Sequence, residues 1–206
     1  MRSMVDESHL FLKPALHRHA VCVDATLGHG KDTAFFLSEG VQKVFAFEIQ
    51  ENILQNTMKK IEDPKVQAFC QGHETMDTLI FEPIDAMIFN FGYCPREDPS
   101  ICTQADTSVI AIQKGLKLLK RKGRMALVLY PHPSGKEEAR CIEKYVQSLS
   151  ASIYTVVQYK QLNKEDSPYL IGIEKKEGYH EKKSIDCVLF TRKQCSAFKR
   201  LDLKCR

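Results

Sequence analysis

Short apolar, β-branched runs alternate with helical patterns along most of the chain. Strand-like runs occupy residues 21–26, 43–49, 66–70, 84–91 and 124–130. Helical patterns begin at residues 31–39, continue in a stretch that ends at Ile61, and recur at residues 107–120 and 137–150. Near-continuous apolar strands that alternate with helices are typical of a parallel sheet covered on both faces. The pattern therefore predicts an α/β fold.

The last two apolar runs break this alternation. Residues 154–162 and 169–175 have only N-K-E-D-S-P and no helix between them, so they are expected to form an antiparallel pair. Five strand–helix repeats closed by an antiparallel hairpin resemble the Rossmann-like class I methyltransferase fold, which has a seven-stranded, mostly parallel sheet with helices on both faces. The prediction divides the chain into a helical lead-in (1–20), a methyltransferase domain (21–176) and a basic extension (177–206).

The composition is that of a globular protein with one main domain. The 206 residues are 43% hydrophobic and 27% charged, which is enough apolar material for a full core. No apolar run is long enough to span a membrane, and the first twenty residues lack the apolar centre of a signal peptide. A cytoplasmic location with no membrane contact is expected. The eight cysteines include no C-x-x-C pair, so no metal site is predicted.

The excess positive charge lies at the C-terminal end. The net charge is +4, and residues 177–206 hold eight Lys or Arg against four Asp or Glu, which accounts for all of it. Such an end is either a solvated tail or an electrostatic aid to binding nucleic acid.

The turn after the first strand is the first candidate site. It reads D-A-T-L-G-H-G-K-D-T at residues 24–33, where Gly28 and Gly30 permit a tight turn and a close approach of a ligand to the backbone. Glu48 ends the second strand, and a carboxylate there can accept both hydroxyls of a ribose. These residues predict an adenosine-containing cofactor.

The remaining polar residues favour S-adenosylmethionine over a dinucleotide. A dinucleotide fingerprint needs a third glycine, and this loop has Asp32 and Thr33 in its place. The carboxylate of Asp24 or Asp32 can bind the ammonium group of S-adenosylmethionine. His73 follows the third strand at the same sheet edge, where it is either a polar loop residue or part of the cofactor pocket.

The fourth strand ends in N-F-G-Y at residues 90–93. This segment resembles the Asn-Pro-Pro-Tyr signature of amino-group methyltransferases, without its two prolines; otherwise it is only a strand end followed by a turn. The resemblance implies that Asn90 accepts a hydrogen bond from the target nitrogen and that Tyr93 packs against the base. Methyl transfer to nitrogen depends mainly on position and orientation, which such contacts supply.

The fifth strand ends in Y-P-H-P-S-G-K-E-E at residues 130–138. An aliphatic amine is mostly protonated at neutral pH, because its pKa is about 10. His132 is therefore a candidate proton acceptor, although a substrate that arrives neutral would need none. Tyr93 and Tyr130 can stack a nucleobase, and Lys136 either meets a phosphate or lies on a solvated helix start.

These motifs together resemble one bacterial and plastid family, labelled rRNA methylase. The segments that carry the resemblance are D-A-T-x-G-x-G-x-D-T, F-x-I-Q, I-F-N-x-G-Y, H-x-x-G-K-E-E and I-E-K, in order between residues 20 and 176. Characterised members convert 5-aminomethyluridine to 5-methylaminomethyluridine at the tRNA wobble position. The resemblance thus implies methyl transfer to an amine in a tRNA anticodon stem-loop, with S-adenosylmethionine as donor.

The resemblance also implies roles for individual residues. Cofactor contacts are expected from Asp24, Thr26, Gly28, Gly30, Asp32, Thr33, Glu48, Gln50, His73, Asn90 and Gly92. Substrate contacts are expected from Tyr93, Thr107, Tyr130, His132 and Lys136, and catalytic roles from Asn90, Tyr93 and His132. The chain departs from the family in having Glu48 where Asp is usual and in a shorter loop after residue 130.

The residues are also compatible with two other functions. A methyltransferase of the same build can act on an exocyclic base amine of rRNA or DNA. A non-catalytic nucleotide- or RNA-binding protein on the same fold is the second alternative. The residues do not decide the oligomeric state, and a homodimer remains open.

Overall fold

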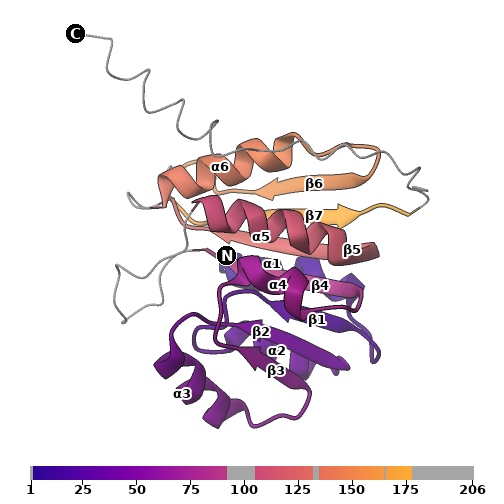
Figure 1. Ribbon diagram of the computed structural model, residues 1–206. Coiled ribbons are helices and arrows are strands. Elements are labelled where there is room, and N and C mark those ends of the chain that lie inside the picture. The colour runs from indigo at the N-terminus through magenta and orange to yellow at the C-terminus, as the bar shows by residue number, and fades with distance from the viewer. Residues whose placement is uncertain (1, 92–104, 132–134, 165, 178–206) are drawn as a thin grey trace.

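The computed structural model describes residues 2–91, 105–131, 135–164 and 166–177, which form a sheet covered by helices (Figure 1). The strands are β1 (Val21–Asp24), β2 (Lys43–Phe47), β3 (Val66–Phe69), β4 (Ile84–Asn90), β5 (Leu119–Leu129), β6 (Tyr154–Tyr159) and β7 (Tyr169–Lys175). The helices are α1 (Met4–Leu12), η1 (Lys13–Ala15), α2 (Lys31–Ser38), α3 (Glu51–Ile61), η2 (His73–Thr75), α4 (Met76–Leu79), α5 (Ala105–Leu118) and α6 (Lys136–Gln147).

The sheet has the strand order β3-β2-β1-β4-β5-β7-β6. Strands β1 to β5 pair in parallel, and β7 pairs antiparallel with both β5 and β6. The predicted α/β fold with a closing antiparallel hairpin is confirmed. The chain moves outward in one direction from β1 to β3 and in the other from β4, so the strand order reverses between β1 and β4. Ligands in doubly wound sheets bind at that point, beyond the carboxyl ends of the strands.

The local differences from the predicted elements have identifiable causes. Strand β5 begins at Leu119, five residues before the predicted start, because Leu119 pairs with Ile84 ahead of a register shift. Lys122 in this stretch adopts a left-handed φ of 62°, which accommodates the extra residues. The short helices η2 and α4 were not predicted, since two turns of helix carry too little periodic pattern.

Two apolar layers hold the helices to the sheet. One layer joins alternate strand residues such as Val23, Met87 and Leu127 to Ile112 of α5 and Ile142 of α6. The other joins the intervening residues of the strands to α1 and α2 and includes Cys22, Ile88, Val128, Leu12 and Phe36. Both faces of the central strands are buried, as the continuous apolar runs indicated.

Helix α1 is an integral part of the second layer. A capping box starts it: the Ser3 hydroxyl accepts the Asp6 N–H, and the Asp6 carboxylate accepts the Ser3 N–H. Phe11 packs over Gly172 of β7 so closely that a Cβ at that glycine would lie 2.7 Å from the ring. Arg124 of β5 donates a hydrogen bond to the Phe11 carbonyl at 2.8 Å. The α1 helix is thereby fixed across β5 and β7.

Candidate functional site

The candidate site lies at the strand reversal between β1 and β4. The chain leaves β1 with the Ala25 N–H donating to the Ile88 carbonyl of β4 at 2.9 Å. It then turns through Gly28 and Gly30, both with positive φ (46° and 76°), into the N-terminus of α2. The polar residues of the loop are thus brought beside the end of β4, as the sequence predicted.

Asp24 is a fully buried carboxyl at the end of β1. Its oxygens accept hydrogen bonds from the Thr33 hydroxyl at 2.7 Å and from the Thr26 N–H at 3.2 Å. Burial, together with the nearby charge of Asp32, raises the pKa of Asp24 to about 7, against the lowering effect of these hydrogen bonds. A cation placed beside these two acids would therefore stabilise their charged forms.

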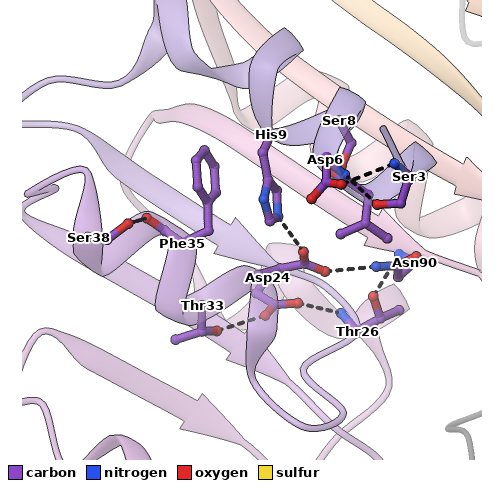
Figure 2. A network of polar contacts seen from close by, with 12 residues as sticks. Ser3, Asp6, Ser8, His9, Asp24, Thr26, Thr33, Phe35, Ser38 and Asn90 are labelled. Carbon is purple, nitrogen blue, oxygen red and sulfur yellow. Dashed lines mark hydrogen bonds and ion pairs between the residues drawn. The ribbon is translucent and has the colours of Figure 1, made fainter. Parts of the chain in front are cut away.

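Asn90, at the end of β4, is held by three hydrogen bonds, and Figure 2 shows the two that join it to the turn after β1 and to α2. Its backbone N–H donates to the Thr26 hydroxyl at 2.7 Å. Its side-chain amide nitrogen donates to Asp32 Oδ2 at 2.9 Å, and its side-chain oxygen accepts from the Tyr130 hydroxyl at 3.1 Å. The amide is consequently oriented with its nitrogen toward α2 and its oxygen toward the end of β5.

Asp32 has a second partner that the sequence analysis missed. His9 of α1 places Nε2 2.7 Å from Asp32 Oδ1, and the imidazole stacks on Phe35 with ring centroids 3.9 Å apart. Figure 2 shows the His9 ring directed at the carboxylate that Asn90 also contacts. No local pattern links a histidine in the first helix to the start of α2 more than twenty residues later, so only the packing of α1 reveals the contact.

Glu48 joins the glycine loop to the start of α3. One carboxylate oxygen accepts the Gly28 N–H at 3.1 Å, and the other accepts the Gln50 N–H at 2.9 Å. The Thr57 hydroxyl of α3 donates to the Gly28 carbonyl at 2.7 Å. A carboxylate has about four lone-pair sites, so two on Glu48 stay available for further donors such as ribose hydroxyls.

His73 lies against the base of the same loop. It is buried, and burial lowers the pKa of its imidazole, which favours the neutral form of the ring. Its Nδ1–H donates to the Ala25 carbonyl at 3.0 Å, and its ring meets Phe89 and Phe91 edge-on. In this arrangement His73 supports the turn after β1.

The predicted substrate residues fall in three places. Tyr130 is brought to Asn90, and burial raises the pKa of its phenol, with Asp32 adding to the effect. Thr107 lies half-buried on α5, whereas Lys136 is exposed at the start of α6 and pairs with Asp166 at 3.1 Å. The other two, Tyr93 and His132, lie outside the described residues, as does Gly92 of the predicted cofactor set.

None of the helices within residues 2–91, 105–131, 135–164 and 166–177 combines the length and the apolar composition that a membrane span requires. Within the same ranges no group of three or more His, Cys, Asp or Glu could hold a metal ion.

Comparison with known proteins relates this geometry to one family. Residues 44–174 match the family model described as "Putative rRNA methylase". A structure from Clostridium thermocellum with the same description is 32% identical, with a TM-score of 0.81 over 85% of this chain and 98% of that chain. A Streptococcus mutans protein, described as a "putative methyltransferase" and solved in complex with SAH, is 36% identical, with a TM-score of 0.78 over 85% and 99% of the two chains.

One curated relative has a more specific name. The "tRNA (mnm(5)s(2)U34)-methyltransferase, chloroplastic" of Arabidopsis thaliana is 26% identical over 193 residues. The match covers 85% of this chain and 70% of the plant protein.

Proposed function

This chain belongs to the rRNA methylase family of S-adenosylmethionine-dependent methyltransferases, and we propose that it methylates the amine of 5-aminomethyluridine at the tRNA wobble position. The observation that carries this proposal is the fixed orientation of Asn90. Its amide nitrogen is committed to Asp32, so its oxygen is the atom presented as a hydrogen-bond acceptor.

An amine needs such an acceptor. The carbonyl oxygen of Asn90 accepts an N–H of the incoming amine, and this aims the nitrogen lone pair away from the amide and along the line of attack. Tyr130 already donates to the same oxygen, which uses one of its two lone pairs and fixes the direction of the other. Orientation of this kind is the main protein contribution to an in-line displacement.

The cofactor fits the residues at the ends of β1 and β2. Asp24 and Asp32 would hold the ammonium group, and the cation would offset the burial and the nearby Asp32 charge that together raise the pKa of Asp24. Glu48 would accept the ribose hydroxyls, with the glycine loop beneath them. When bound, the cofactor supplies its sulfonium methyl group: an N–C bond forms to the amine as the S–C bond breaks, and one proton leaves the nitrogen.

The remaining predicted residues complete the proposal. His132 would accept the proton of the amine, and Tyr93 would stack against the uracil ring. Thr107, Tyr130 and Lys136 would face the anticodon stem-loop, with Thr26, Thr33, Gln50, His73 and Gly92 on the cofactor side. The choice of a tRNA substrate is supported by the name of the plant relative and by the family motifs in the sequence.

The direct test measures methyl transfer to two RNA pools. Labelled S-adenosylmethionine is incubated with tRNA from cells that stop at 5-aminomethyluridine and, separately, with ribosomal RNA, and the nucleosides are then resolved. Label in 5-methylaminomethyluridine is the expected result. Label only in ribosomal RNA would replace the proposal with base-amine methylation, and no label in either pool would leave a nucleotide- or RNA-binding role.

The role of Asn90 needs a matched pair of variants. Asn90→Ala is expected to bind the cofactor normally and to lose turnover by about 100-fold or more, because the amine is no longer positioned. Gln55→Ala changes an exposed side chain on α3 that donates a hydrogen bond to Glu51 at 3.0 Å, and it serves as the control with unchanged turnover. An Asn90→Ala enzyme with full turnover would contradict the assigned orientation role.

A further inference from the structure

The His9–Asp32 contact connects the first helix of the chain to the amide that faces the substrate. His9 reaches Asp32 Oδ1 at 2.7 Å, and Asn90 reaches Asp32 Oδ2 at 2.9 Å. The side chain of Asp32 is 6% exposed and that of His9 is 18% exposed. Both oxygens of a nearly buried carboxylate are therefore used, one by α1 and one by β4.

The charge of Asp32 determines which way the Asn90 amide faces. A carboxylate accepts hydrogen bonds and cannot donate them, so only the amide nitrogen of Asn90 can face it. If the amide were turned by half a rotation, its oxygen would meet Asp32 Oδ2 and its nitrogen would point at Tyr130. The reversed amide would present a donor to the amine, and the substrate would lose its acceptor.

The position of Asp32 depends in turn on His9. With the imidazole removed, Oδ1 would be left without this donor in a nearly buried place, which is unfavourable, and the carboxylate would rotate toward water. Stacking on Phe35 limits the rotation of the His9 ring and so fixes the direction of its N–H. Helix α1 is itself held on β5 and β7 through Phe11.

We propose that His9 is a positioning residue for the methyl transfer: it holds Asp32 so that the Asn90 amide presents its oxygen to the substrate amine. This inference rests on the proposed function for its kinetic test. It also has a test in the cofactor-free protein, which does not require any substrate to be known.

Two substitutions separate the donor from the packing. His9→Phe keeps an aromatic ring to stack on Phe35 and removes the hydrogen-bond donor. His9→Gln loses the ring but keeps an N–H at a similar distance from the backbone. At saturating cofactor, His9→Phe is expected to lower kcat by about 10- to 100-fold, and His9→Gln to restore most of the rate. Equal losses in both variants, matching a loss of folded protein in thermal unfolding, would overturn the positioning role.

A double-mutant comparison checks that the effect passes through Asn90. Adding His9→Phe to Asn90→Ala is expected to cause little further loss, because the amide that His9 positions is already absent. If the two losses multiply instead, His9 acts on the reaction by another route and the proposal is wrong.

The spectroscopic test is independent of turnover. The chain contains four asparagines, so selective ¹⁵N-asparagine labelling gives a simple set of side-chain amide signals, and the Asn90→Ala spectrum identifies the one from Asn90. That signal is expected to be sharp and slow to exchange in the wild type and in His9→Gln, and broadened or shifted in His9→Phe. An unchanged signal in His9→Phe would refute the inference. If the Asn90 signal changes as expected but neither RNA is methylated, the role of His9 in orienting Asn90 is supported and the proposed substrate is wrong.

Discussion

The buried carboxyl of Asp24 gives the chain a pH dependence that can be measured without any substrate. Its pKa is raised to about 7, chiefly by burial and then by Asp32. In the unfolded chain an aspartate titrates near its ordinary value of about 3.9. Between these two values the folded state holds a proton that the unfolded state has released, so stability falls as the pH rises through this window.

The magnitude follows from the separation of the two pKa values. A difference of about three pKa units corresponds to about 4 kcal/mol of destabilisation above pH 7, and about 2–3 kcal/mol of this develops between pH 5 and pH 8. Asp24→Asn removes the titrating group and keeps an oxygen that can accept from Thr33 or Thr26. The free energy of unfolding of the variant is therefore expected to rise by about 2–3 kcal/mol relative to that of the wild type between pH 5 and pH 8.

Urea unfolding followed by circular dichroism at the two pH values measures this difference. Asp77→Asn is the control, because Asp77 is an exposed partner of Lys114 and should show no comparable change between the two conditions. The reasoning is refuted if the unfolding free energies of the wild type and of Asp24→Asn differ by the same amount at pH 5 and at pH 8. That result would mean that Asp24 does not hold a proton in the folded protein.

Three further predictions concern single residues. Glu48→Gln should weaken S-adenosylmethionine binding in calorimetry by about 10-fold or more, because hydrogen bonds to a charged group contribute about 1.5–3 kcal/mol each; unchanged affinity would remove Glu48 from the cofactor site. Tyr130→Phe removes the hydroxyl that fixes the Asn90 oxygen, so kcat should fall by about 10-fold with the same cofactor affinity; a loss in affinity alone would argue against this. Gly30→Ala should destabilise the protein by about 2 kcal/mol or more and Gly40→Ala by only about 1 kcal/mol, as unfolding experiments can check. Both glycines have a positive φ, but a Cβ at Gly30 would lie 2.8 Å from Ile61 and from Thr57, and one at Gly40 would meet nothing within 4 Å.

The fold could be predicted from the sequence because its signal is carried by whole strands. The runs V-C-V-D, K-V-F-A-F and I-D-A-M-I-F-N are buried on both faces, and such strands need helices on either side. The fold class, the family and the S-adenosylmethionine cofactor were all predicted and are confirmed. The ends of the first six strands were predicted one to three residues too far along the chain, because the pairing partner decides where a ladder of hydrogen bonds ends.

The site could be predicted only in part. Asp24, Asp32 and Asn90 were recognised because each follows an apolar strand or a glycine turn, and the topology brings such ends together. His9 was not recognised, since its importance comes from a contact between helix α1 and the first turn of α2 that no spacing encodes. The orientation of the Asn90 amide could not be predicted from the sequence either, because it depends on which group faces its nitrogen and which faces its oxygen.

The docking of α1 has a consequence for the order in which the protein acquires its site during synthesis. The helix is made first, yet the surfaces that hold it belong to β5 and β7, and its carbonyl at Phe11 is bonded by Arg124, 113 residues later. While the ribosome is still making the first half of the chain, α1 lacks the surfaces of β5 and β7 that hold His9 over Asp32 in the folded protein. A nascent chain that already has β1, β2 and the glycine loop would thus lack the ordered Asn90 amide until β7 has emerged and paired with β5.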